Sequence, residues 1–244
     1  MSALIQVREA TQVFGTRTIF RDVSFGIDQG EVFVILGGSG CGKSTLLKQM
    51  IGLLPPTAGE ITVASYSVNT QVEEVRRHIG VMFQSGALFG SMNLQENVSL
   101  PLAVFTDLPK EACAEIARLK LGLVGLTEAA SRLPSEISGG MVKRAAIARA
   151  LALDPPILML DEPSAGLDPV TSAGLDRLIL GLRDSLGTTF VVVTHELASI
   201  MAIADRCAML DAKAQGLIAL GKPQDLKQTA TDPTVRAFFH RETL

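Results

Sequence analysis

Apolar runs that end in turn residues recur along the chain and predict the strands of a sheet. The clearest runs cover residues 31–36, 157–160 and 189–193, and each precedes a stretch that is compatible with a helix. Strands that are apolar throughout are covered on both faces, and strands that alternate with helices pair in parallel. We therefore expect an α/β fold with a parallel core sheet wrapped by helices.

A second pattern lies near the amino end, where polar and apolar residues alternate. It covers residues 5–14 and 19–27, and residues 59–63 follow a turn at Pro55 and Pro56. Alternation is typical of strands that bury only one face. These segments predict a small antiparallel β layer beside the core sheet.

Helical spacing replaces the strand signals between about residues 88 and 152. Residues 110–121 and 141–153 have this spacing, and we expect breaks at Pro101, Pro109 and Pro134. This predicts a helical subdomain, about residues 86–153, inserted between core strands. Because neither an internal repeat nor a Gly/Ser-rich linker interrupts the sequence, residues 1–244 are expected to form one domain.

Composition and charge narrow the cellular setting. Hydrophobic residues make up 47% of the 244 residues, yet no apolar stretch approaches the roughly 20 residues of a membrane-spanning helix. The first ten residues include Arg8 and Glu9 and lack the charged-then-apolar order of a signal peptide, so we expect a cytoplasmic protein. Three scattered cysteines, Cys41, Cys113 and Cys207, agree with a reducing compartment. A net charge of −3 gives no indication of a nucleic-acid partner, and we expect none.

A glycine-rich sequence follows the first apolar run and opens a helix. Residues 37–45 read Gly-Gly-Ser-Gly-Cys-Gly-Lys-Ser-Thr, which is the spacing of a phosphate-binding P-loop. Glycines let the loop aim N–H groups at phosphate oxygens, and the helix adds the positive end of its dipole. Lys43 would supply charge to the β- and γ-phosphates and Ser44 a ligand of Mg²⁺; the alternative is an ordinary Gly-rich turn. The residues expected to bind the nucleotide phosphates here are Gly38, Ser39, Gly40, Cys41, Gly42, Lys43, Ser44 and Thr45.

Cys41 has two interpretations. A helix terminus lowers the pKa of a nearby thiol, which would make Cys41 reactive. A small residue that fills space is the interpretation we favour.

Two acids end the apolar run at residues 157–160. Neighbouring residues on a strand point to opposite faces, so one carboxylate can reach Mg²⁺ while the next faces the water that attacks the γ-phosphate. We assign Asp161 to the metal and Glu162 to the general base. The alternative is that both acids cap the next helix.

The run at residues 189–193 ends at Thr194-His195-Glu196. A lone histidine is usually structural. At the same edge of the same sheet, however, His195 can contact the γ-phosphate, and we favour this sensor role.

Ser138-Gly139-Gly140 precedes a helix that we expect over residues 142–153. This second helix amino end is suited to an anion. Because the P-loop already covers one side of a nucleotide, the second site would bind the phosphates of another molecule's nucleotide across a dimer. The alternative is a Ser N-cap with glycines for packing.

In this order, the P-loop, Gln84, Ser138-Gly139-Gly140, Asp161-Glu162, residues 164–168 and His195 resemble the ABC ATPase family over essentially the whole chain. The resemblance implies the P-loop NTPase fold of ABC ATPases, the cofactors ATP and Mg²⁺, and a head-to-tail homodimer. It implies that Phe14 is the aromatic platform for adenine and Asp168 a contact across the dimer. It further implies that Gln84 senses both Mg²⁺ and the transmembrane permease. On this basis Gln84 is placed among the metal ligands and among the catalytic residues.

Within that family, Met141 and residues 83–89 and 194–200 are similar to the ATPases of the Mla and Mce lipid transport systems. Membership implies transmembrane permease subunits, a periplasmic lipid-binding protein of the Mce type and a small accessory cytoplasmic subunit. The substrate would be a phospholipid or a related lipid. The protein would lie on the cytoplasmic face of the inner membrane.

Two other classes of function stay open. One is an ABC ATPase for another solute, such as an amino acid importer. The other is a soluble ABC protein of DNA repair, translation or iron-sulfur assembly. The absence of long coiled coils and of a second cassette from the sequence argues against the first two of these soluble roles.

Residues 85–105 are predicted to dock on the permease. Glu96 is the only charged residue in this segment, which is too apolar for a loop that faces water. We expect Leu88 and Phe89 to be contacts and Glu96 to lie at the rim. Packing inside the helical subdomain is the alternative for each apolar residue.

Overall fold

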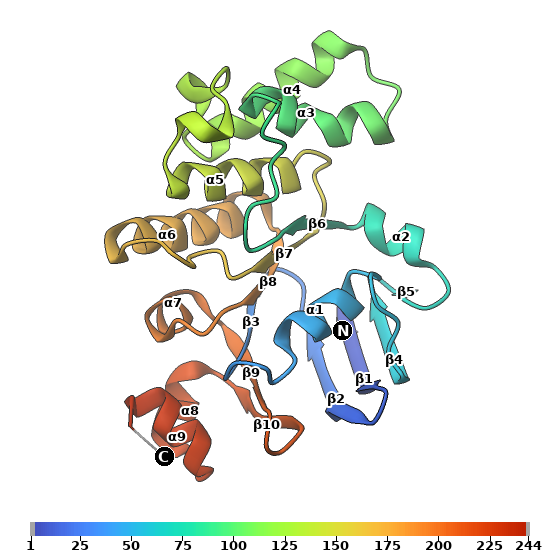
Figure 1. The fold of residues 1–244 in the computed structure, drawn as a ribbon, viewed down its shortest axis with the longest axis vertical. Coiled ribbons are helices and arrows are strands. Elements are labelled where there is room, and N and C mark those ends of the chain that lie inside the picture. The colour runs from blue at the N-terminus through green and yellow to red at the C-terminus, as the bar shows by residue number, and fades with distance from the viewer. Residues whose placement is uncertain (1–2, 243–244) are drawn as a thin grey trace.

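The computed structural model describes residues 3–242, and Figure 1 shows helices gathered at both ends of a central sheet. The strands are β1 (Ile5–Phe14), β2 (Arg17–Ile27), β3 (Val32–Gly37), β4 (Ala58–Val63), β5 (Tyr66–Ser67), β6 (Ile79–Met82), β7 (Ile157–Asp161), β8 (Thr189–Val193), β9 (Arg206–Asp211) and β10 (Gly216–Gly221). The helices are α1 (Lys43–Met50), α2 (Val72–Arg77), α3 (Leu94–Phe105), α4 (Lys110–Leu123), α5 (Gly139–Ala150), α6 (Pro169–Leu186), α7 (Leu197–Ile203), α8 (Pro223–Thr229) and α9 (Pro233–His240), with 3₁₀ turns at Thr127–Ala129 and Pro134–Glu136. Within residues 3–242, no helix combines the length and apolar character that crossing a bilayer requires.

The larger sheet has six strands in the order β10-β9-β3-β8-β7-β6. The strands from β9 to β6 pair in parallel, and β10 pairs antiparallel with β9. Every residue of β3 and β8 is buried, which explains their continuous apolar sequences. The parallel core sheet predicted from the sequence is therefore confirmed.

Alternate residues of the core strands face two separate hydrophobic cores. Val34 and Val192 pack with residues of α3 to α6, whereas Phe33 and Val191 pack with residues of β1, β2 and α1. Both faces of the sheet are thus covered by apolar side chains. Only the ends of its strands are left for polar chemistry.

The smaller sheet has four strands in the order β2-β1-β4-β5, and each neighbouring pair is antiparallel. It confirms the predicted antiparallel layer. Its buried face includes Ile5, Phe20 and Ile61, which complete the core beneath the larger sheet. The β layer therefore supports the sheet face that carries α1.

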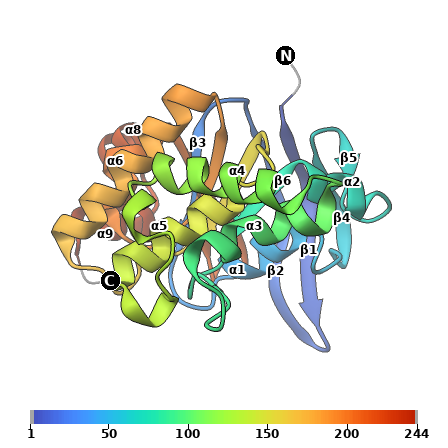
Figure 2. The same cartoon turned by 90° about the horizontal axis from the view of Figure 1, so that it is seen from above.

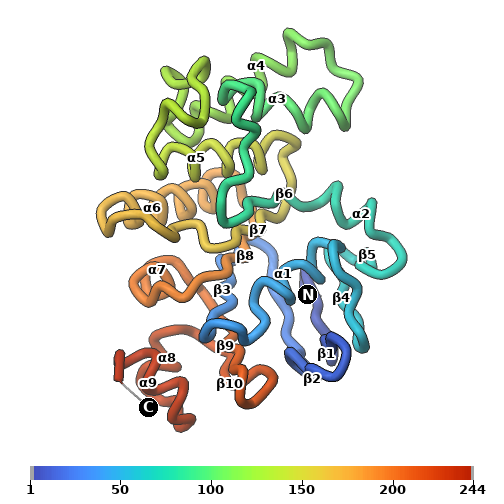
Figure 3. The backbone as a smooth tube through the Cα atoms, viewed as in Figure 1, coloured from blue at the N-terminus to red at the C-terminus, as the bar shows by residue number. Residues whose placement is uncertain are grey.

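Helices α3, α4 and α5 pack against one another at one end of the molecule. Figure 2 shows α4 and α3 crossing over the central elements when the molecule is viewed from that end. The chain reaches this end directly after β6, and Figure 3 shows it rising past α5 toward α3. The path from β6 to α3 is therefore a connection between sheet and helices.

The predicted break at Pro101 is wrong, because Pro101 lies inside α3. Reciprocal hydrogen bonds of 2.8 Å between Asn93 and Glu96 cap the start of this helix, and its buried residues anchor it in the core. The breaks at Pro109 and Pro134 are confirmed. Pro109 is the N-cap of α4, and Pro134 opens a 3₁₀ turn.

Helix α5 covers Gly139–Ala150 rather than the predicted residues 142–153. Ser138 is its N-cap, and the Ser138 hydroxyl accepts a hydrogen bond of 3.3 Å from the N–H of Met141. A serine in this position fixes the first helical residue directly after itself. The two glycines are therefore part of the first helical turn.

Candidate functional site

Four neighbouring parallel strands end at one edge of the larger sheet. There β3 leads into the glycine-rich loop, β8 into Thr194 and His195, β7 into Asp161 and Glu162, and β6 toward Gln84. Ligands of open α/β sheets bind at the carboxyl ends of strands. The residues that the sequence singled out at four separate places are thus brought to one edge.

The glycine-rich loop turns sharply between β3 and α1. Gly37 has φ +145°, and a Cβ there would lie 2.2 Å from the carbonyl oxygen of Leu210, so only glycine fits. The side of Gly40 is open instead. The Lys43 ammonium donates hydrogen bonds of 2.9 and 3.0 Å to the carbonyl oxygens of Gly37 and Gly38. The loop holds the Lys43 cation beside the exposed residues Gly38, Ser39 and Gly40, which is the arrangement of an anion site.

Cys41 is fully buried within this loop. Burial raises the pKa of its thiol, and the nearby Lys43 charge opposes this rise without cancelling it. Its burial and its raised pKa both favour the space-filling interpretation over the reactive one. Cys41 fills space beneath the loop.

Asp161 is the last residue of β7 and is half-buried. Burial is the largest cause that raises the pKa of its carboxyl, and the Glu162 charge adds to the rise. The Ser44 hydroxyl and the ammonium groups of Lys48 and Lys43 lower this pKa, which places Asp161 close to the start of α1. Asp161 and Ser44 are therefore close enough to contact the same bound ion.

Glu162 follows the strand rather than continuing it, so its direction is not set by strand alternation as the sequence argument assumed. Its backbone has φ +47°, a conformation that costs a residue with a Cβ about 1–3 kcal/mol. A hydrogen bond of 2.8 Å from its N–H to the Val193 carbonyl holds this turn. Strained backbone of this kind persists where the surrounding structure fixes it, as at functional sites.

The Glu162 carboxylate is buried against an exposed histidine. Its Oε1 lies 2.8 Å from Nδ1 of His195, whose side chain is 62% exposed. Sequence reasoning placed both residues at this edge but did not foresee that they touch. The histidine fixes one carboxylate oxygen of Glu162 and leaves the other, Oε2, without a hydrogen-bond partner among residues 3–242.

Gln84 lies in a turn after β6 with an exposed side chain. Its carbonyl oxygen accepts a hydrogen bond from the ammonium of Lys143 on α5. The same ammonium lies 3.3 Å from the carbonyl oxygen of Glu162. Sequence reasoning missed Lys143, although a lysine among the alanines and isoleucine of a buried helix was a signal that could have found it.

The second anion site lies apart from the P-loop. Figure 1 places α5 and α1 in different tiers of the molecule, with α6 and the sheet between them. Ser138 and Gly139 are exposed, whereas a Cβ on Gly140 would lie 2.6 Å from the Thr171 methyl group, so Gly140 serves packing on α6. The exposed amino end of α5 therefore cannot complete the P-loop of its own chain.

Asp168 and Phe14 are the two other residues that the family resemblance singled out. Asp168 is the N-cap of α6, and hydrogen bonds from the Thr171 hydroxyl and N–H hold the pKa of its carboxyl below the usual range. Phe14 ends β1 with 49% of its surface exposed. Both side chains are accessible on the described surface.

The residues of the edge fit Mg²⁺ bound together with phosphates. Asp161 Oδ1, Glu162 Oε2 and Ser164 Oγ are buried without a hydrogen-bond partner among residues 3–242, and each such atom costs about 1–3 kcal/mol. In the same part of the chain, no group of three His, Cys, Asp or Glu could hold a metal alone. Mg²⁺ needs only one or two protein ligands when phosphates supply the rest.

Comparison with known proteins agrees with this geometry. The family described as ABC transporter matches residues 20–165. The probable ribonucleotide transport ATP-binding protein mkl of Mycobacterium leprae is 42% identical over 244 residues, covering 98% of this chain and 70% of that protein. The intermembrane phospholipid transport system ATP-binding protein MlaF of Escherichia coli K12 is 41% identical over 240 residues, covering 97% and 88%.

Solved structures agree as well. CbiO1 from Clostridium perfringens, part of the ABC transporter complex cbiONQ, has a TM-score of 0.84 at 28% identity and covers 93% of this chain and 91% of its own. The ATP-binding cassette MJ0796, a dimer bound to ADP and Pi, has a TM-score of 0.79 at 31% identity and covers 89% and 98%.

The chain belongs to the ABC transporter family. It is an ATP-binding subunit and an ATPase with the fold of an ABC ATPase cassette. The similarity to MlaF-type ATPases that Met141 and residues 83–89 indicated is confirmed over nearly the whole chain.

Proposed function

We propose that this ATPase powers the transport of phospholipid or a related lipid between membranes, from the cytoplasmic face of the inner membrane. The observation that carries the proposal is the 41% identity to MlaF, a protein of an intermembrane phospholipid transport system, over 88% of its length. Residues 1–244 act in this proposal as one ATP-binding domain whose helical subdomain covers about residues 86–153.

In this proposal, residues 38–45 bind the phosphates of ATP and Phe14 stacks on adenine. Ser44, Asp161 and Gln84 hold Mg²⁺, which would neutralise charge on the phosphates when bound. The proximity of Ser44 to Asp161 and the unpaired Asp161 Oδ1 support this assignment.

Glu162 is the proposed general base. Oε2 would accept a proton from the attacking water, while His195 keeps the carboxylate in place through Oε1. The exposed side chain of His195 supports its proposed sensor role at the γ-phosphate.

The proposed active unit is a head-to-tail homodimer. In it, Ser138, Gly139 and Gly140 of one chain bind the nucleotide on the P-loop of the other, and Asp168 lies at the contact between chains. The exposure of Ser138 and Asp168 supports this arrangement, as does the separation of α5 from α1 in Figure 1.

Changing Ser138→Arg is expected to leave ATP binding intact and to block hydrolysis, because the lesion lies on the partner's nucleotide. Mixing variants tests this directly. A dimer of one Lys43→Ala chain and one Ser138→Arg chain carries both lesions in one composite site and should recover part of the activity. Complete inactivity of the mixed dimer would favour a purely structural role for Ser138.

The proposed permease surface differs in detail from the predicted one. Leu94, Val98 and Leu102 of the predicted segment are buried in the core, and Glu96 is occupied in capping α3. Leu88 packs partly against the core. The burial of Leu94, Val98 and Leu102 supports the packing interpretation for these three residues.

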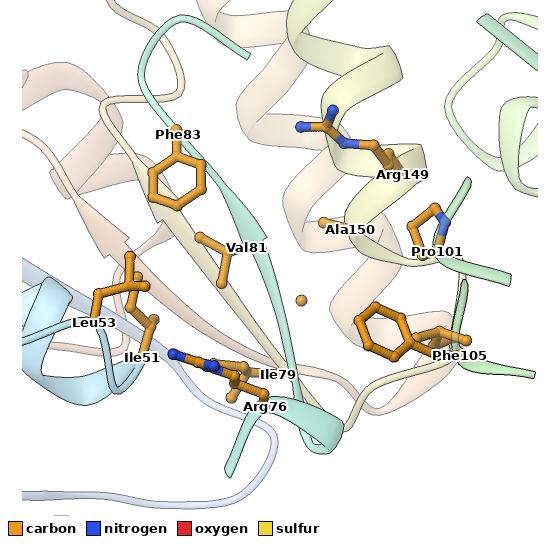
Figure 4. Close-up of a pocket in the computed structure, with 12 residues that line it drawn as sticks. Ile51, Leu53, Arg76, Ile79, Val81, Phe83, Pro101, Phe105, Arg149 and Ala150 are labelled. Carbon is orange, nitrogen blue, oxygen red and sulfur yellow. The ribbon is translucent and has the colours of Figure 1, made fainter. Parts of the chain in front are cut away.

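An apolar groove of about 270 Å³ lies between the sheet and the helical end. Figure 4 shows Phe83 and Val81 on one side and Pro101 and Phe105 on the other. Arg76 and Arg149 flank the groove. We assign it to a permease helix that presents apolar side chains and an acidic residue, because such a helix matches the apolar lining and the Arg149 cation, whereas Arg76 is already paired with Glu73 at 3.0 Å. The groove begins at Phe83, next to Gln84, so nucleotide state can reach it.

Phe105→Asp is expected to weaken association with the permease by at least tenfold, because it places a charge in the apolar lining. Leu119→Asp is the matched control. Leu119 is 71% exposed, as Phe105 is 72% exposed, but it lies on α4 outside the groove. Pull-down of the permease from detergent extract measures both, and equal effects of the two variants would place the docking surface elsewhere.

The names of the relatives favour two substrate classes. MlaF belongs to a phospholipid system, whereas mkl is described as a probable ribonucleotide transport protein. We favour lipid, and with it a periplasmic Mce-type protein and a small accessory cytoplasmic subunit as partners. Purifying the chain with its partners and analysing bound molecules by mass spectrometry tests this. Enrichment of phospholipid supports the proposal, and enrichment of nucleotides other than ATP and ADP, without lipid, would overturn it.

A further inference from the structure

Lys143 is a buried cation that the proposed mechanism leaves without a role. It lies on α5, five residues after Ser138, and only 7% of its surface is exposed. Burial lowers the pKa of its ammonium below the usual value, and the nearby Glu162 and Asp161 charges only partly oppose this shift. A lysine is rarely buried unless it is paired, so its contacts indicate its purpose.

The ammonium of Lys143 joins two backbone segments of the functional edge. It donates to the carbonyl oxygen of Gln84, after β6, and lies 3.3 Å from the carbonyl oxygen of Glu162, after β7. Both partners are backbone atoms. Their side chains therefore stay free for chemistry while Lys143 fixes where those side chains start.

A second cation of the same helix shows which contact is special. Arg149 donates hydrogen bonds of 2.9 and 2.7 Å to the carbonyl oxygens of Gly86 and Ala87. Both cations therefore attach the segment after β6 to α5. Of the two, Lys143 alone also bonds Glu162 among the described residues, so it alone joins α5 to the general base.

We propose that Lys143 is a positioning residue that holds the backbone of Gln84 and Glu162 against α5, and so connects the two ATP sites of the dimer. The inference rests on the proposed dimer. In that dimer Ser138 of a chain serves one ATP site, while Glu162 of the same chain serves the other. A contact from α5 to Glu162 within one chain therefore runs from one site to the other.

The homodimer gives the first test. Lys143→Met, which keeps the length and loses the donors, should lower kcat about tenfold with KM and ATP affinity nearly unchanged, because it misplaces the base and leaves the P-loop intact. Lys143→Arg should restore much of the rate, since a guanidinium can donate to both carbonyls. Arg149→Met should have a smaller effect on the ATPase rate of the isolated subunit. Thermal unfolding of each variant separates lost positioning from lost folding.

Mixed dimers give the sharper test. In a dimer of one Ser138→Arg chain and one partner, the intact site uses Glu162 of the Ser138→Arg chain and Ser138 of the partner. Lys143→Met is then placed either in the Ser138→Arg chain or in its partner. Both dimers contain the same substitutions, but only the first puts Lys143→Met behind the working Glu162. The first is expected to turn over about tenfold more slowly than the second.

Each outcome is decisive. Equal rates in the two dimers would overturn the proposal, because a purely structural role of Lys143 acts from either chain. A slower second dimer would also overturn it, and would show that Lys143 acts through Ser138. The dimer with Ser138→Arg alone checks the proposed function separately: if it is fully active or fully inactive, the composite site fails, and the connection between sites fails with it.

Discussion

Replacing Glu162 by Gln is expected to lower kcat for ATP hydrolysis about a thousandfold. An amide keeps the size of the side chain but cannot accept the proton of the attacking water, and general-base catalysis contributes roughly 10²–10⁴-fold to a rate. The buried Glu162 Oε2, which has no hydrogen-bond partner among residues 3–242, is the atom that this change removes from the chemistry. Steady-state ATPase assays over a range of ATP concentrations measure it.

ATP binding should survive the same change. Glu162 does not belong to the glycine-rich loop, so the affinity measured by calorimetry should stay within a few-fold of that of the unchanged protein. Turnover near the normal rate would remove Glu162 from the role of base. A large loss of affinity would show instead that Glu162 acts in binding.

Replacing Lys43 by Ala should have the opposite signature, a loss of ATP affinity of about 100-fold. Charge-assisted hydrogen bonds contribute about 1.5–3 kcal/mol, and each 1.4 kcal/mol is roughly tenfold in affinity. In the structure the Lys43 ammonium lies over the loop, bonded to the carbonyl oxygens of Gly37 and Gly38, where it is placed to meet phosphate in the ground state.

Lys48→Ala is the control for Lys43→Ala. Lys48 is an exposed cation on the same helix whose charge also lowers the pKa of Asp161, but it makes no hydrogen bond to the loop among residues 3–242, so it controls for charge near the site without a phosphate contact. Its removal lowers the net charge equally and should keep most of the affinity. If calorimetry gives the same ATP affinity for both variants and the unchanged protein, Lys43 does not bind the phosphates.

The parts of the fold that could be predicted are those whose residues are buried on both faces. β3, β7 and β8 are apolar along their length, and their sequences show it. β6 has four residues, two of them only half-buried, and β9 begins with an arginine, so neither stands out in the sequence. Their places are fixed by pairing with β7 and β3, which is tertiary information.

The candidate site likewise has residues that the sequence identifies and contacts that it does not predict. Motifs identify Lys43, Asp161 and Glu162 because each motif is local in the sequence. The contacts of His195 and Lys143 with Glu162 join residues that are 33 and 19 positions apart, and no local pattern predicts them. The sequence favoured a space-filling role for Cys41 but could not give the direction of its pKa shift, because that pKa depends on how much protein covers the thiol.

If ATP hydrolysis by this subunit drives lipid movement, a reconstituted transporter should show the coupling. The subunit, assembled with its permease in liposomes, is given labelled phospholipid, and lipid movement is followed with and without ATP. Lipid movement should need ATP and should disappear with Glu162→Gln, while the complex stays assembled. Lipid movement that is the same without ATP, or ATP-driven uptake of ribonucleotide with no movement of lipid, would contradict it.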